Sequence, residues 1–276
     1  IRHEFTRSPD TNADWTSDDE IYLDGQLEEK EYVRQGAYAQ NHRHTVNAYY
    51  TGKVKDWTID VNMDGMWYRN YEKDWNNSTY QQVNQEEQTL LVTSTVHNTH
   101  HLYATKLVLT HPLAGGTLSF GGEYSHSKRT NLFVNPQGIV ADDDSYSKEG
   151  IASAFVEYGR QIGKASLQAG VRYEHVAFDY YIKNIHRKDM SRTTDDFFPS
   201  LGLSFPIGKV QMQLGYAKDI LRPSFSQLSG EVTYNNRYTY QTGNPLLLPM
   251  TTDNISLNAI YRWASLSVGY QHIKNK

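Results

Sequence analysis

Hydrophobic and polar residues alternate with a period of two along several stretches of the chain. The odd positions of one stretch are Trp57, Ile59, Val61, Met63, Gly65 and Trp67, and the even positions are Thr58, Asp60, Asn62, Asp64, Met66 and Tyr68. Because successive residues of a strand point to opposite faces, this pattern predicts a strand with one apolar and one polar face. The alternation returns in residues 117–124, 166–173 and 210–217, and no stretch has a comparable helical period. An all-β fold is therefore predicted.

Short turns and long polar stretches divide the predicted strands. The short turns fall at residues 52–56, 111–116, 159–164 and 206–209, and the long polar stretches at 70–88, 125–148, 183–196 and 222–253. Short turns at one end and long loops at the other are typical of an antiparallel up-and-down transmembrane β-barrel. We expect about ten strands of a larger barrel between His42 and Ile273, with periplasmic turns and extracellular loops.

The polar face of these strands fits the inside of a wide barrel, which is turned to water or to a plug. Aromatic residues near strand ends are expected to form girdles at the two membrane interfaces. They are Trp57, Trp67, Tyr68, Tyr71, Phe197, Phe198 and Trp263. The stretch from residue 57 to 70 is longer than a bilayer requires, so the strands are expected to project above the membrane. A soluble antiparallel sandwich also alternates and stays open as an alternative.

The first part of the chain is polar and harder to interpret. Residues 10–20 are acidic, and residues 28–31 form a charge run. We therefore expect two regions, a polar loop or hairpin region over residues 1–41 and the barrel segment over residues 42–276.

Composition excludes several classes of protein. The chain has 27 Lys and Arg against 31 Asp and Glu, a net charge of −4 that is too even for a nucleic-acid binder. The absence of Cys excludes disulfide scaffolds and thiolate zinc sites. There is no apolar run long enough for a transmembrane helix. Because no signal peptide is visible and the first residue is Ile1, a processed product or excised fragment is expected.

Several motifs in the last third of the chain occur in a characteristic order. They are FPSLGLS at residues 198–204, RPSFSQL at 222–228 and YTYQTGNPLLLP at 238–249, preceded by SLQAGVRYE at 166–174 and LSFGGEYSH at 118–126. This order resembles the barrel of TonB-dependent outer-membrane receptors of the Bacteroidetes type. The sequence departs from that pattern at Leu248 and Met250, where the family often has Lys and Glu.

The resemblance implies a function. It implies the barrel portion of a receptor that takes up a scarce nutrient across the outer membrane of a Gram-negative bacterium, without catalysis and without a cofactor. Energy would come from the inner-membrane proton gradient through TonB, acting on a plug domain that we expect outside this internal slice of the receptor. The implied partners are outer-membrane lipid, TonB through the plug, a small nutrient ligand and a surface lipoprotein.

The polar strand face and a Tyr-rich loop supply the candidate ligand-binding or plug-facing residues. They are Asp60, Asn62, Asp64, Glu123, Gln168, Arg172, Glu174, Gln211, Gln213, Tyr238 and Tyr240. Pairing within the wall is the structural alternative for the strand residues. A self-packed loop is the alternative for the two tyrosines.

A histidine cluster supplies the remaining candidate chemistry. His97, His100 and His101 are candidates for a metal or haem site, although the lack of Cys and of nearby carboxylates favours a solvated surface. The same residues would carry catalysis if the chain were an outer-membrane barrel enzyme of the lipase or protease type. A soluble β-sandwich binding module is the second alternative. We predict neither an enzyme nor a metal site.

Overall fold

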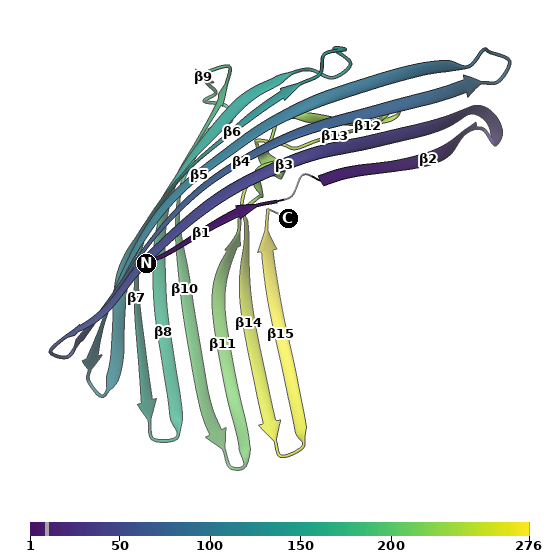
Figure 1. Cartoon of the computed structure of the whole chain (residues 1–276). Helices are drawn as coiled ribbons and strands as arrows, with labels where there is room; N and C mark the ends of the chain where they lie inside the picture. Colours follow the sequence, from purple (N-terminus) through teal and green to yellow (C-terminus); the bar gives the residue numbers. More distant parts are fainter. Residues whose placement is uncertain (9–10, 276) are drawn as a thin grey trace.

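The computed structural model describes residues 1–8 and 11–275, and it consists almost entirely of antiparallel strands (Figure 1). Residues 9, 10 and 276, which fall within the two expected regions, lie outside the described residues. One sheet of 13 strands follows the order β1-β3-β4-β5-β6-β7-β8-β10-β11-β14-β15, with β2 paired to β3 and β9 to β8. This up-and-down arrangement confirms the predicted fold class.

The strands shorten along the path, from 29 residues in β3 to 11 in β15. Their bounds are β1 Arg2–Arg7, β2 Thr11–Leu23, β3 Gln26–Val54, β4 Trp57–Gln82, β5 Gln88–Leu113, β6 Gly116–Val134, β7 Asp143–Ile162, β8 Ala165–Ile182, β9 Ile185–His186, β10 Arg192–Ile207, β11 Val210–Leu221, β12 Val232–Asn236, β13 Thr239–Thr242, β14 Met250–Tyr261 and β15 Ala264–Lys274. The one short helix among the described residues is α1, Phe225–Leu228. No helix of the described chain is long and apolar enough to cross a membrane.

The predicted short turns are confirmed. Two residues connect β3 to β4, β5 to β6, β7 to β8 and β10 to β11. Gly163 and Gly208 adopt φ of 60° and 61°, a left-handed conformation that is costly for residues with a Cβ. These turns lie together at the lower ends of the strands in Figure 1.

The expectation of long loops is wrong for two of the four polar stretches, residues 70–88 and 125–148. Strand β4 continues to Gln82 and β5 begins at Gln88, while β6 continues to Val134 and β7 begins at Asp143. Backbone pairing does not depend on apolar side chains, so a strand with water on its outer face continues through polar sequence. The long connection that remains runs from residue 222 to 249 and holds α1, β12 and β13. We call it the inner segment.

The first 41 residues also form strands. Strands β2 and β3 make a hairpin that turns at Asp24 and Gly25, which have φ of 49° and 81°. Strand β3 then runs from residue 26 to 54 and crosses the expected boundary between residues 41 and 42 without a break. It pairs with β4 from Glu29 to Val54. The hairpin is thus continuous with the sheet of the barrel segment.

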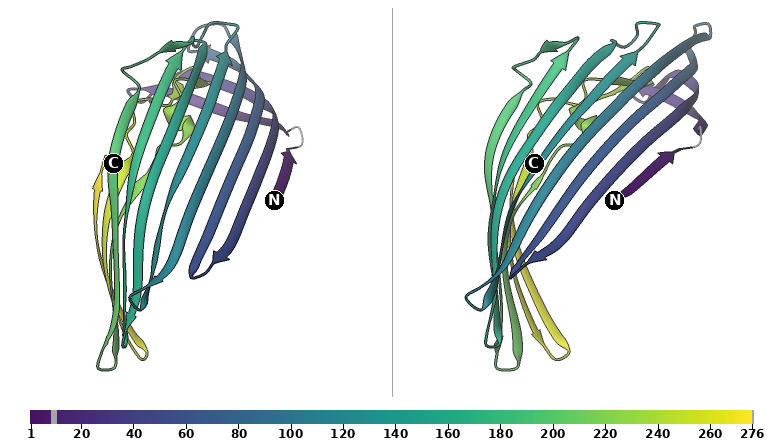
Figure 2. Two further views of the ribbon diagram at one scale, coloured as in Figure 1. Left: turned by 90° about the vertical axis from the view of Figure 1, so that its left-hand side faces the viewer. Right: turned by 60° about the vertical axis from the view of Figure 1, so that its left-hand side comes forward.

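The sheet curves like one side of a barrel (Figure 2). Its path begins at β1 and ends at β15, and in the part of the chain that the structure describes these two edges do not pair with each other. The inner segment packs against the concave side, at the upper ends of the strands. Two apolar clusters join it to the sheet. One contains Val96, Phe133, Val140, Val232 and Tyr234, and the other Phe178, Tyr180, Ile182, Met190 and Leu228.

Candidate functional site

One face of the sheet is a belt of exposed apolar side chains. Paired residues of neighbouring strands share a face, and the belt follows such pairs, for example Val61 with Leu107 and Leu214 with Leu257. Its exposed members include Met63, Leu107, Val156, Val171, Leu201, Leu214, Ile255, Leu257, Leu266 and Val268. An exposed apolar belt on a wall of strands is the surface that contacts lipid. We call this the outer face and the opposite one the inner face.

Aromatic side chains border the belt. Its upper edge carries Trp67, Tyr103, Tyr124, Tyr173 and Phe197. Trp57 marks the lower edge, and the residues between it and Trp67 rise ~33 Å along the strand, or ~25 Å at a tilt of ~40°, the height of a transmembrane apolar band. Tyr68 and Phe198 were expected in the girdles but lie on the inner face, because they occupy the even positions of their strands.

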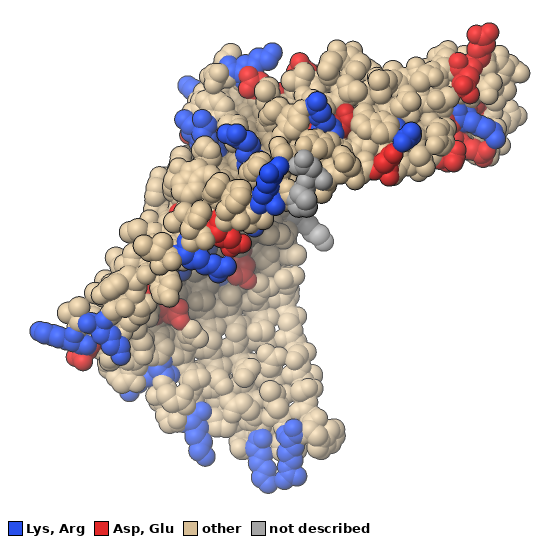
Figure 3. All heavy atoms as spheres, viewed as in Figure 1, with Lys and Arg blue, Asp and Glu red and all other residues tan. Residues whose placement is uncertain are grey.

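Charged side chains lie at the two ends of the strands, on either side of the apolar belt. Figure 3 shows Lys and Arg gathered at the lower turn end and both signs mixed at the upper end. The two-residue turns there include Lys55, Lys164 and Lys209. Charges at the two ends flank the apolar belt, as expected for strands that cross a membrane.

The nine strand residues predicted to face the lumen all lie on the inner face. The pairing Asn62–Lys106–Glu123–Ser153–Glu174 crosses β4 to β8 in one row. The others fall on the same face by alternation along β4, β8 and β11. They are Asp60, Asp64, Gln168, Arg172, Gln211 and Gln213.

Most of these side chains bond to their neighbours. Thr51 Oγ1 donates to Asp60 at 2.6 Å, and Asn62 Nδ2 donates to Asp64 at 2.6 Å. Lys106 Nζ lies 4.0 Å from a Glu123 oxygen, and Gln168 donates to Glu157. The lower inner face is therefore a hydrogen-bonded polar lining.

Two of the predicted residues form an ion pair in which only the carboxylate is buried. The Glu174 side chain is 3% exposed, and its Oε2 lies 3.2 Å from Nη2 of Arg172, whose side chain is 41% exposed. Arg222, at the start of the inner segment, also pairs with Glu174. Further down, Gln211 donates to Ser204 at 2.8 Å, and Gln213 lines a groove of about 410 Å³ with Gln168.

The three candidate histidines do not converge. His97 lies on the outer face with its ring 4.6 Å from that of Tyr71, and His101 pairs with Trp67 on the same face. His100 lies on the inner face and accepts from Arg129 Nε at 3.2 Å. Among residues 1–8 and 11–275, no three His, Cys, Asp or Glu side chains come together in a group that could hold a metal ion.

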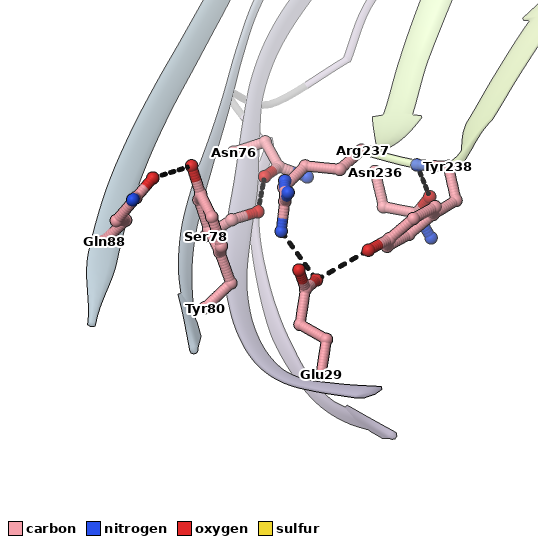
Figure 4. Close-up of polar contacts among 8 residues, drawn as sticks. All are labelled: Glu29, Asn76, Ser78, Tyr80, Gln88, Asn236, Arg237 and Tyr238. Carbon is pink, nitrogen blue, oxygen red and sulfur yellow. Dashed lines mark hydrogen bonds and ion pairs between the residues drawn. The ribbon is translucent and has the colours of Figure 1, made fainter. Parts of the chain in front are cut away.

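Tyr238 anchors the inner segment to the wall (Figure 4). Its hydroxyl donates to Glu29 Oε1 at 2.7 Å, and Arg237 Nη1 donates to the same oxygen at 2.6 Å. The Arg237 guanidinium lies 3.3 Å from the centre of the Tyr80 ring. Glu29 is only 2% exposed, so its charge depends on these donors and on a further side-chain hydrogen bond from Gln82. Tyr240 is half exposed and packs edge-on against Tyr234.

The motifs RPSFSQL (residues 222–228) and YTYQTGNPLLLP (residues 238–249), on which the family resemblance rests, contact each other. Ser224 and Gln227 form a reciprocal capping box at the start of α1. Asn244 N donates to the Gln227 carbonyl at 2.6 Å. A Cβ at Gly243 would lie 2.5 Å from the carbonyl oxygens of Ser226 and Ser229, so only glycine fits this contact.

An acidic cavity lies between the inner segment and the upper wall. It has a volume of about 420 Å³, and its lining includes Glu72 and Asp74 of β4 and Glu231 of the inner segment. Burial, then the Glu72 charge, raises the pKa of Asp74 to about 6. Burial, then the charge of Asp143 and the two β4 carboxylates, raises the pKa of Glu231 to about 7. Both groups lie above the membrane belt.

Sequence reasoning missed this cavity because it placed Glu72, Asp74 and Glu231 in loops. The sequence pattern does indicate which face Glu72 and Asp74 occupy. The alternation that assigns Asp60 and Asp64 to the inner face continues through Glu72 and Asp74. Nothing in the sequence indicates that Glu231 lies opposite them.

Comparison with known proteins agrees with this architecture. The model of the outer membrane protein beta-barrel family matches residues 50–276. No curated protein matches the sequence. Similar solved structures include the copper transporter OprC (10% identity, TM-score 0.45, 97% of this chain and 54% of that chain) and the ferric-catecholate import receptor Fiu from K12 E. coli (11%, 0.45, 97% and 58%). A third is the ferric yersiniabactin uptake receptor FyuA from Yersinia pestis (11%, 0.43, 95% and 49%).

The chain spans about half the length of the solved structures that it matches. The family match covers most of the chain and confirms the predicted location in the outer membrane of a Gram-negative bacterium. The belt, the girdles and the polar lining are the features expected of such a barrel. The chain belongs to the outer membrane protein β-barrel family.

Proposed function

We propose that the chain is the barrel portion of a TonB-dependent receptor that carries a scarce nutrient across the outer membrane. The observation that carries this proposal is the polar inner face, which gives the strands a hydrogen-bonded hydrophilic lining. The open edges at β1 and β15 support a larger barrel, since unpaired backbone groups cannot remain in lipid. A plug within that barrel would contact the lining, and TonB would act on the plug.

In this proposal the polar lining and the inner segment have different roles. The polar lining of the lower inner face, which extends from β4 to β11, faces the plug or a passing ligand. Tyr238 positions the inner segment, and Tyr240 is exposed to ligand. The protein does not catalyse a reaction, and a surface lipoprotein is a further proposed partner.

Uptake in cells tests the proposal. The complete receptor that contains this chain is expressed in matched TonB-positive and TonB-negative strains, and growth is measured on limiting ferric siderophores, haem, cobalamin, peptides or oligosaccharides. We expect growth on one of these nutrients that requires both the receptor and TonB. Growth that is independent of TonB on every nutrient, or hydrolysis of a lipid or peptide substrate by the purified receptor, would contradict it.

A further inference from the structure

The cavity under the inner segment is lined by carboxylates and, among the described residues, by no Lys, Arg or His side chain. Glu72 and Asp74 line it from β4 and Glu231 from the inner segment, and Asp143 of β7 lies close enough to act on Glu231. Burial and neighbouring carboxylates raise the pKa of Asp74 and of Glu231. The groups that lower these two pKa values are neutral: Ser94 for Asp74 and Asn131 for Glu231.

A row of asparagines lies beside these carboxylates. Asn70 of β4, Asn98 of β5 and Asn131 of β6 are paired in register across three neighbouring strands. Asn70 Nδ2 donates to Glu72 at 3.4 Å, and Asn131 Nδ2 donates to Asp143 at 2.8 Å. Asn98, the middle member, lines the cavity itself. The row is the lower boundary of the cavity on the inner face.

The side-chain oxygens of all three asparagines are buried and accept no hydrogen bond. Asn131 is 2% exposed and Asn70 is 9% exposed, so the protein shields these acceptors from bulk water. Buried acceptors without a donor are uncommon and destabilising. Since the amide nitrogens of Asn70 and Asn131 are held by carboxylates, rotating these two amides would break those bonds.

The titratable groups one row down on the inner face are Arg43 of β3, Tyr68 of β4, His100 of β5 and Arg129 of β6. None of these four side chains lines the cavity. Arg129 is engaged, since it donates to His100 and lies 5.7 Å from the centre of the Phe225 ring. The cavity therefore offers carboxylate and amide acceptors beside neutral Ser, Thr and Gln side chains, and its described lining contains no cationic side chain.

We propose that this cavity binds an ammonium or guanidinium group of the transported nutrient. Such a group supplies several N–H donors and a positive charge, which complement the unpaired amide oxygen of Asn98 and the carboxylates of the lining. A metal ion is disfavoured because the carboxylates do not converge into a metal-binding group within the described residues. Val96 and Phe133 in the lining fit the carbon chain that carries the cation. This inference rests on the proposed transport function.

Calorimetric titration of the purified complete receptor tests it with spermidine as the cationic probe, maltotriose as the neutral probe and citrate as the anionic probe. We expect spermidine to bind at pH 7.5 and to bind about tenfold more weakly at pH 5.5, where Asp74 and Glu231 take up protons. Glu231→Gln and Asp74→Asn should each weaken binding about tenfold while preserving shape.

Asp189→Asn is the matched control. Asp189 is an exposed carboxylate bound to Arg187 at 2.8 Å, outside the cavity, so its loss should leave binding unchanged. Circular dichroism and resistance to detergent-induced unfolding at room temperature verify that each variant is folded.

Several results would overturn the inference. They are a failure of spermidine to bind, binding that Glu231→Gln leaves unchanged, and Ca²⁺ competing with spermidine at lower concentration. If uptake depends on TonB and spermidine does not bind, the transport proposal stands and this inference fails. If spermidine binds as described and no uptake depends on TonB, the cation site stands and the transport proposal fails.

Discussion

The lower and upper halves of the same strands place their apolar side chains on opposite faces. In β5, Leu107 and Leu109 lie on the outer face of the lower half, whereas Val92 and Val96 lie on the inner face of the upper half. Strand β8 changes in the same way, from Val171 on the outer face to Phe178 on the inner face. The apolar positions change parity within one unbroken strand.

The surroundings explain this change. Lipid surrounds the lower outer face, and the lower inner face is polar. Water surrounds the upper outer face, and the inner segment covers the upper inner face. Apolar side chains lie in each half on the face that is removed from water. The exchange of parity therefore marks the level at which the wall leaves the membrane.

Removing a core side chain of the upper half should give the largest effect. Phe133→Ala deletes a ring that is 2% exposed between the wall and the inner segment, and such deletions cost about 3–5 kcal/mol. Leu132→Ala, one residue away on the outer face, should cost little because Leu132 is 43% exposed. Urea titration of the protein refolded into lipid vesicles measures both. Equal losses would contradict the change of parity.

A charge in the lower belt should give the next largest effect. Leu214→Arg places a guanidinium in the middle of the lipid-facing belt, at a cost of about 2–4 kcal/mol. Gln213→Arg changes the neighbouring residue, which lines the polar inner groove, and should change stability little. The same titration compares the two variants. A larger loss for Gln213→Arg would mean that the lipid face is assigned wrongly.

Breaking the anchor of the inner segment should have a smaller and more local effect. Arg237→Ala leaves Glu29 buried with one fewer charged donor, which should weaken docking of the segment by about 2 kcal/mol. Hydrogen exchange of residues 232–242 should become faster, while exchange in β14 and β15 stays the same. Exposed Arg2→Ala is the control, since its pair with Glu4 is open to water.

The pH should modulate docking of the inner segment least. A carboxyl whose pKa is higher in the folded state holds its proton more tightly there, so docking is favoured where the carboxyl is protonated. The pKa rises from 3.8 to about 6 for Asp74 and from 4.5 to about 7 for Glu231. Docking should therefore weaken as the pH rises from about 4 to about 7. Hydrogen exchange, corrected for intrinsic rates, measures this, and Glu231→Gln should remove part of the trend.

The candidate site was accessible from the sequence only in part. Alternation from residue 57 onward assigned Asp60, Asn62 and Asp64 to the inner face correctly. Because a loop is expected after residue 70, Glu72 and Asp74 are not assigned to the inner face, although the same alternation places them there. Low hydropathy after residue 70 predicts the end of the strand, whereas in the upper half it reflects water on the outer face.

The amino-acid pattern predicts the membrane-level halves of the strands, the two-residue turns, the face of each strand residue and the family, because each depends on short-range pattern or on contiguous motifs. The position of the inner segment and the upper halves of the strands follow from the three-dimensional structure alone. The bonds from Arg237 and Tyr238 to Glu29 join positions about two hundred residues apart, and Glu231 meets the β4 carboxylates in the same way. Side-chain periodicity reports which face a residue occupies. It cannot report which distant segment covers that face, since that depends on the curvature of the whole sheet.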